Sequence, residues 1–209
     1  GEVLIESLVA AGWPAKRLVC LEAPPGLAAS AGTHPARRGF DLSETDFGSG
    51  RDQFASVLRQ ITALIDVPFL KTHNICGMTS CLKNLSHGLV KHPARYHGNG
   101  CSPYIGDIVG AAPIRSRLRL CRVDAFRVVF SPGPPARAAT VSDEGVLLAS
   151  TDPVAADRVG LTVLNDIRRE RGLEPVGGSA VGPAYLRAAH DRGVGIGVWT
   201  RIDRVVARE

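Results

Sequence analysis

The sequence predicts an α/β fold: a layered, largely parallel sheet flanked by helices, in a single domain over residues 1–209. Short apolar runs typical of strands alternate along the chain with amphipathic runs of helical period, and this alternation favours a largely parallel sheet. A length of 209 residues suits one domain better than two. Hydrophobic residues make up 44% and charged residues 22%, which excludes a disordered chain.

In the first third of the chain, apolar spacing predicts a helix at 2–11, a strand at 17–23, a helix at 54–65 and a strand at 63–70. Gly12 follows the first helix in the position of a C-terminal cap. Residues 24–50 are rich in Pro, Gly, Ser, Thr and Ala and show no period. They predict a long loop or lid, because loops of this length usually serve a function.

In the rest of the chain, the patterns predict a helix at 77–87, strands at 121–130, 145–149 and 197–206, and helices at 153–171 and 183–192. Ser102 and Pro103 predict one more helix start, with the serine as cap and the proline in the first turn. Asp152 and Pro153 have the same arrangement before the long helix.

The positive charge is concentrated in one part of the chain. Between Lys71 and Arg122 there are eight Lys or Arg residues, one acid (Asp107) and four of the six histidines. This block is either a solvated surface or a site for an anion. Nucleic acid is not expected, because the only aromatic residues in the block that could interleave with the charges are Tyr96 and Tyr104. No apolar run approaches the roughly 18 residues that a membrane span needs.

The densest group of reactive side chains is Lys71, Thr72, His73 and Asn74, directly after a predicted strand. Ligands of parallel α/β sheets bind outside the carboxyl ends of the strands. Lysine can bind an anion or form a Schiff base, and histidine can act as acid, base or metal ligand.

The predicted helix at 77–87 adds a second group of polar side chains. Thr79, Lys83 and His87 lie four residues apart and share one face, and Asn84 joins its edge. The helix contains no acid, although solvated helix surfaces usually mix acids with bases. We therefore expect Lys71, His73, Lys83 and Asn84 to converge on one site.

Two aspartates belong to the long predicted helix. Capping accounts for Asp152, with substrate binding as the alternative. Asp157 falls on the apolar stripe, so we expect it to be buried and paired. We predict a partner among Lys71, Lys83 and His73, and the alternative is a structural pair with Arg122 or Arg158.

The five cysteines are an odd number, and we expect no disulfide between them, with Cys20 and Cys121 buried in strands. The spacing of Cys76, Cys81, Cys101 and Cys121 matches neither zinc-ribbon nor ferredoxin patterns. Weak candidates for metal ligands are Cys76, Cys81, His92, His97 and Cys101. No phosphate-binding P-loop and no dinucleotide-binding glycine motif is present.

The segments DVPFLKTHN, GMTSCLKNLSHGL, STDPVAAD and YLRAAHDRGVGIG resemble the domain of unknown function 362 family over about Ile65 to Gly197. The resemblance implies Lys71, His73, Lys83, Asn84, Asp152 and Asp157 as shared motif positions. Members begin with a strand bearing a K-P-N element, which this sequence does not contain, so we expect the N-terminal strand to be missing. Some members carry an iron–sulfur module or a twin-arginine leader, and neither is visible in this sequence.

The sequence therefore predicts a bacterial-type soluble protein, an enzyme of unknown reaction that binds a small anionic metabolite. The catalytic candidates are Lys71, His73, Lys83 and His87, and the substrate-binding candidates are Thr72, Asn74, Thr79, Asn84, Asp152 and Asp157. Two alternatives stay open: a metal or iron–sulfur-associated redox protein, and a non-catalytic binding module. A redox partner or a second copy of the chain is an open possibility. The expected location is cytoplasmic, with export left open by the incomplete N-terminus.

Overall fold

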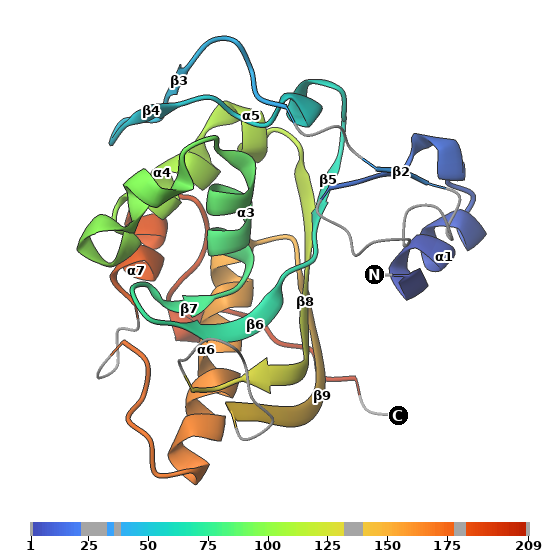
Figure 1. The fold of residues 1–209 in the computed structure, drawn as a ribbon. Coiled ribbons are helices and arrows are strands. Elements are labelled where there is room, and N and C mark those ends of the chain that lie inside the picture. Colours follow the sequence, from blue (N-terminus) through green and yellow to red (C-terminus); the bar gives the residue numbers. More distant parts are fainter. Residues whose placement is uncertain (1, 22–32, 36–38, 132–139, 178–182, 208–209) are drawn as a thin grey trace.

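The structure, a computed structural model, describes residues 2–21, 33–35, 39–131, 140–177 and 183–207. A five-stranded mixed sheet lies beside a group of helices, and the predicted α/β class is confirmed (Figure 1). The strands of this sheet are β5 (Leu64–Asp66), β6 (Phe69–His73), β7 (Gly77–Thr79), β8 (Leu118–Val129) and β9 (Val141–Ser150).

The long strand β8 organises the sheet. Both β5 and β6 run parallel to it, β5 beside its first residues and β6 beside its last. The opposite edge of β8 pairs antiparallel with β9, and β7 pairs antiparallel with β6 to form a hairpin. Three of the four strand pairs therefore involve β8, and the antiparallel β6–β7 hairpin lies further out.

The alternation along β8 decides which face of the sheet is covered. Cys121, Val123 and Ala125 are fully buried against the helices, whereas Phe126 and Arg127 are exposed. Successive side chains of a strand point to opposite faces, so one face of β8 carries the core. The β8–β9 ladder shifts its register between Ala125 and Arg127, and Val128 returns to the buried face.

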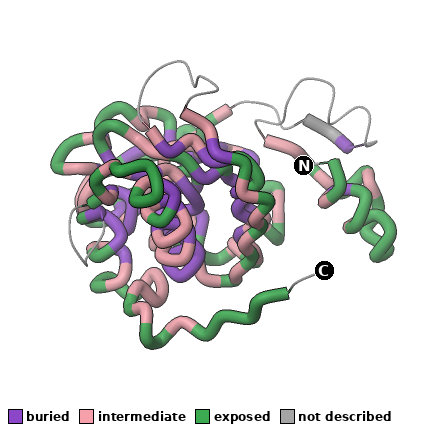
Figure 2. The backbone as a smooth tube through the Cα atoms, turned by 90° about the horizontal axis from the view of Figure 1, so that it is seen from below, coloured by how far each residue is buried: buried purple, intermediate pink, exposed green. Residues whose placement is uncertain are grey.

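Helix α6 (Pro153–Glu170) lies along this face and contacts β6, β8 and β9. Its buried stripe includes Leu161, Leu164 and Ile167, and burial of each such side chain contributes about 1.5–3 kcal/mol. Helix α3 (Cys81–Leu89) packs beside α6, with α4 (Tyr104–Gly110), α5 (Ala112–Arg115) and α7 (Ala184–Asp191) further out. Buried residues gather in this sheet-and-helix part of the molecule (Figure 2).

The N-terminal part consists of short elements. They are α1 (Glu2–Ala10), the 3₁₀ turn η1 (Ala15–Arg17), β1 (Val19–Cys20), β2 (His34–Pro35), β3 (Thr45–Asp46), β4 (Arg51–Asp52) and the 3₁₀ turn η2 (Ser56–Arg59). Helix α1 is mainly exposed and lies to one side of the sheet (Figures 1 and 2). Strands β2 and β3 fall within the predicted loop at 24–50, and much of that loop lies outside the described residues. None of the helices in the described ranges is long and apolar enough to cross a membrane.

Several predicted elements are confirmed with small shifts of their ends: the first helix, the strands around β8 and β9, and the helices α6 and α7. Gly12 follows α1 with a φ of 92°, as a cap glycine should. The helix predicted after Ser102 begins at Tyr104, so Pro103 is its N-cap and Ser102 makes no side-chain cap.

Three other predicted elements are wrong. The helix at 54–65 is replaced by the short turn η2, because Phe54 and Leu58 are buried by tertiary packing rather than by a helix face. The strand at 63–70 is divided into β5 and β6, with Pro68 in the break. The closing strand at 197–206 is absent from the described residues, which there form only the 3₁₀ turn η5 (Trp199–Arg201).

Candidate functional site

The β6–β7 hairpin carries the first part of the site. Lys71 pairs with Thr79 and His73 pairs with Gly77, so Lys71, His73 and Thr79 share one face of the hairpin. Thr79 therefore lies on a strand, and the prediction that it lies on a helix is wrong. Thr72 belongs to the opposite face, where its hydroxyl donates to the carbonyl of Val129 at 3.2 Å. Asn74 is exposed in the turn.

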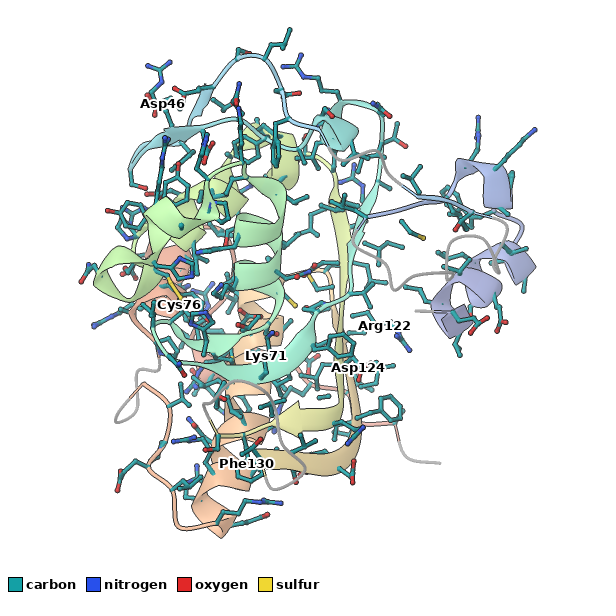
Figure 3. All side chains as sticks on the ribbon, in the orientation of Figure 1. Asp46, Lys71, Cys76, Arg122, Asp124 and Phe130 are labelled. Carbon is teal, nitrogen blue, oxygen red and sulfur yellow. A yellow bond between two sulfur atoms is a disulfide. The ribbon has the colours of Figure 1, made fainter. Side chains whose placement is uncertain are left out.

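Helix α3 starts immediately after the hairpin and adds Lys83 and His87. The two residues are four apart, so they lie on one face of the helix. Lys71 and Lys83 are close enough that each charge acts on the hairpin: both lower the pKa of His73. Lys71, His73 and Lys83 thus lie near one another, whereas Asn84, the fourth residue expected to converge with them, bonds Asp66 instead. Figure 3 shows Lys71 on β6 beneath α3.

The 3₁₀ segment η3 (Pro93–Cys101) brings a third histidine to the same place. The ring of His97 stacks on His73 with 5.6 Å between centroids, and it meets the His87 ring edge-on at 4.6 Å. The fold thus gathers two lysines and three histidines from β6, α3 and η3. We refer to Lys71, His73, Lys83, His87 and His97 as the basic cluster.

Burial and like charges set the protonation of the basic cluster. Burial, assisted by the charge of Lys71, lowers the pKa of Lys83 to about 8. Burial and the charge of Lys83 lower the pKa of His73 to about 4 and that of His87 to about 3. At neutral pH both imidazoles are therefore neutral and Lys83 is mostly an ammonium.

Hydrogen bonds assign different tautomers to the two neutral histidines. The His73 Nδ1 atom accepts from the backbone N–H groups of Ile75 and Cys76, both at 3.2 Å. Its proton therefore lies on Nε2, which is a donor. The Ser86 hydroxyl donates to the carbonyl of Lys83 and lies 3.0 Å from His87 Nδ1. With its one proton on the Lys83 carbonyl, the hydroxyl accepts from Nδ1–H, and in that arrangement a lone pair remains on His87 Nε2.

Two polar atoms near the basic cluster are buried without a hydrogen-bond partner among the described residues. They are the Thr79 hydroxyl oxygen and His87 Nε2. Buried polar atoms are nearly always paired in native proteins, and an unpaired one costs about 1–3 kcal/mol. A bound molecule that donates to His87 Nε2 and bonds Thr79 would remove this cost.

Asp157 is fully buried, as predicted, but its predicted partners are wrong. Its two oxygens accept from the backbone N–H groups of Cys81 at 2.7 Å and Leu82 at 3.2 Å. These are among the first N–H groups of α3, which have no partner within the helix. Asp157 on α6 therefore holds the start of α3 and acts on Lys83 only through the position of that helix.

Two other predicted residues also have structural partners. Asp152 caps α6 by accepting from Val154 and Ala155, and its other oxygen accepts from Ile196 at 2.7 Å. Asn84 is exposed, and its amide donates to Asp66 Oδ1 at 2.7 Å. Asn84 thus lies at the edge of the predicted site and faces β5 rather than the basic cluster.

The cysteines differ from the prediction. Cys76 and Cys101 form a disulfide, which joins the hairpin turn to η3, so the expectation of no disulfide is wrong. Cys121 is buried as predicted, but Cys20 is only half-buried. Cys81 lies near Cys121 and away from the disulfide. The five cysteines are therefore spread over three places, and the four thiolates that an iron–sulfur cluster requires do not meet.

The remaining metal candidates are also engaged. His92 Nδ1 lies 2.9 Å from Asp52 Oδ1, apart from the basic cluster. One ligand atom each of His73, Cys76 and His97 lies within 4.8 Å of the others. In this group the Cys76 sulfur is in the disulfide and His73 Nδ1 is occupied by two backbone N–H groups, so these two atoms are not free to bind a metal ion.

Sequence reasoning missed two residues that matter in the structure. His97 was considered only as a metal ligand, although its ring contacts those of both His73 and His87. Asp66 is 4% exposed and contacts Asn84, yet the sequence predicts only that it belongs to a short strand. An acid inside an apolar run was the one signal that pointed to it.

These features define a class of α/β protein in which a mixed sheet is flanked by helices and a basic cluster lies beside the β6–β7 hairpin. Residues 38–162 match the family described as "Domain of unknown function (DUF362)". The match covers more than half of the 209 residues, so the chain belongs to this family. It includes the hairpin, α3 and Asp157, whereas α7 and the GVGIG segment lie beyond it. No curated protein and no solved structure matches the chain.

Proposed function

We propose that the chain is an enzyme that binds a small anionic metabolite at the basic cluster. Lys71 and Lys83 would bind the anionic group, His73 would donate from Nε2, and His87 would accept a proton at Nε2. The observation that carries the proposal is the lack of any counter-charge. Among the described residues, no carboxylate forms a salt bridge or hydrogen bond with either lysine.

The charges support an anion in particular. Burial, and after it the charge of Lys71, destabilise the Lys83 cation and lower its pKa. A bound carboxylate or phosphate would relieve this repulsion and would be attracted by the concentrated positive potential. The hydrogen bonds of an anion to charged donors are worth about 1.5–3 kcal/mol each.

The tautomers support a role in proton transfer. In this arrangement His73 offers an N–H and His87 offers a lone pair, so two rings that both contact His97 provide a donor and an acceptor. A base that must accept a proton needs a free lone pair within reach of its substrate. The unpaired His87 Nε2 would supply the free lone pair.

Anion binding can be tested with inorganic pyrophosphate and citrate as probes, by calorimetry and thermal shift. K83M should weaken binding about tenfold to a hundredfold, because one charged hydrogen-bond donor is lost. The matched control is K91M, because Lys91 belongs to the same basic block but bonds Gln53 away from the cluster. Equal affinity of K83M and wild-type protein for both probes would contradict the proposal.

Catalysis is tested separately with H87A. Citrate, whose methylene groups carry C–H bonds, is incubated with the protein in D₂O, and loss of its C–H signal is followed by NMR. Exchange that occurs with wild-type protein and disappears in H87A, at unchanged affinity, would support His87 as the base. Binding without exchange or turnover would identify a non-catalytic binding module instead.

A further inference from the structure

A second cluster of reactive side chains lies in the core, outside the basic cluster. It consists of Asp66 on β5, Cys81 at the start of α3 and Cys121 on β8. Their ligand atoms, one carboxylate oxygen and two sulfurs, all lie within 4.8 Å of one another, and all three residues are buried.

The fold brings these residues together through two separate contacts. Asp66 and Cys121 are paired neighbours in the parallel β5–β8 ladder, so their side chains leave the same face of the sheet. Cys81 is the first residue of α3, and Asp157 holds it in place by accepting its backbone N–H at 2.7 Å. The helix start therefore lies over the two strand residues.

Asp66 is prepared for a further ligand. Its Oδ1 atom accepts from the Asn84 amide at 2.7 Å, whereas its Oδ2 atom is buried and has no partner among the described residues. Carboxylates that bind metals are commonly oriented in this way by a hydrogen bond to the second oxygen. Asp66 is 4% exposed, so water does not satisfy Oδ2 from the surface.

The cluster is short of positive charge. Burial raises the pKa of Asp66 to about 7, opposed by its hydrogen bonds and assisted by the nearby Asp157. The pKa of Cys81 is raised by its contact with the Cys121 thiol and by burial. None of the groups that act on Asp66 is a cation: they are Asn84, Asp157 and Cys81. A divalent cation would stabilise the ionised forms of the carboxyl and the thiols.

We propose that Asp66, Cys81 and Cys121 bind one divalent cation of the zinc class, independently of the basic cluster. Two thiolates and a carboxylate suit zinc, with bonds of about 2.3 Å to sulfur and 2.0–2.2 Å to oxygen. Those bonds place ligand atoms roughly 3.6–3.8 Å apart, so side-chain rotations are enough to close the site. Binding releases the two thiol protons to solvent, and the affinity therefore rises with pH.

The site would join β5, β8 and the start of α3. Asn84 would be its supporting residue, one position after Lys83 of the basic cluster. The cation would therefore act as a structural clamp that fixes the helix carrying Lys83 and His87. It would not contact the anion.

The test is to unfold the full chain with its disulfide intact, treat it with a chelator, and refold it with Co²⁺ or Zn²⁺. Wild-type protein should bind one equivalent, and Co²⁺ should give the near-ultraviolet absorption typical of sulfur ligands. C121S should lose this absorption. N84A, which changes an exposed side chain, should keep the stoichiometry and weaken affinity about 10- to 100-fold, because it removes the supporting hydrogen bond.

Two variants are matched controls. C20S removes a cysteine outside the cluster, and H97A removes the histidine that faces His73; both should bind Co²⁺ like wild-type protein. The proposal is overturned if wild-type protein binds no metal, if H97A loses the metal while C121S keeps it, or if mass spectrometry of the purified chain finds Cys81 disulfide-bonded to Cys121. Loss of pyrophosphate binding in K83M has no bearing on these outcomes, so the two proposals fail separately.

Discussion

Replacing Asp157 with asparagine is the sharpest test of how α3 is held. Each carboxylate oxygen of Asp157 accepts one backbone N–H of α3, at 2.7 Å from Cys81 and 3.2 Å from Leu82. Asparagine has one acceptor oxygen, and its NH₂ group faces the other N–H without accepting from it. At pH 5, where Asp157 is protonated, we expect D157N to lower the free energy of unfolding by about 1–3 kcal/mol.

The cost of the substitution should shrink as the pH rises. Burial raises the pKa of Asp157 from 3.8 to about 7. Between these values the unfolded carboxyl has lost its proton and the folded one keeps it, so stability falls with rising pH. The slope is about 1.4 kcal/mol per pH unit, or roughly 2.7 kcal/mol from pH 5 to 7. D157N lacks this loss, so it should approach or exceed wild-type stability near pH 8.

Urea unfolding of the chelator-treated protein at pH 5, 6, 7 and 8 measures the effect. D166N is the matched control, because Asp166 lies on the same helix but is exposed and paired with Arg169; its effect should be small and nearly independent of pH. A difference between D157N and wild-type protein that stays constant from pH 5 to 8 would refute the reasoning, since Asp157 would then ionise alike in both states.

Three further predictions follow from the contacts of single residues. The pyrophosphate affinity of wild-type protein, measured by calorimetry, should fall as the pH rises through about 8, where the Lys83 ammonium is lost. The affinity of K83R should not change over this pH range. The same pH dependence of affinity in both proteins would exclude Lys83 as the anion ligand. D152A should lower the free energy of unfolding in urea by about 1–2 kcal/mol and leave the pyrophosphate affinity unchanged. G195A should also destabilise the fold, because its Cβ would lie 2.0 Å from Asp152. A loss of affinity without a loss of stability would contradict the structural role of Asp152. The double variant C76S/C101S should lose about 3.5 kcal/mol, since the disulfide spans 25 residues; an unchanged urea midpoint would show that the disulfide adds no stability.

Local patterns in the sequence determined the longest strand, β8, and the longest helix, α6. The strand around Cys121 is the strongest β-type run, and it is the spine β8. Asp152 followed by Pro153 predicts the start of α6, and the Asp152 side chain accepts from the first two N–H groups there. Both signals depend on residues a few positions apart, so they survive in any tertiary context.

The hairpin was missed because its signal is not local. Gly77–Thr79 directly precedes α3, and its short apolar content continues the helical pattern of Leu82 and Leu85. Only pairing with β6 makes it a strand. The apolar residues of 54–65 are the reverse case: their spacing imitates a helix, but Phe54 and Leu58 are buried by contacts with distant segments.

For the site, the sequence by itself determined that Lys71, His73, Lys83 and His87 are candidates. The end of a predicted strand followed by a helix without acids is a local pattern, so it can be recognised from consecutive residues. Only the tertiary structure decided that His97 joins them, that Asp157 pairs with a helix start, and that Asp66 meets two cysteines. These contacts join residues 10 to 76 positions apart. Their partners follow from crossover connections and packing, which no local spacing encodes.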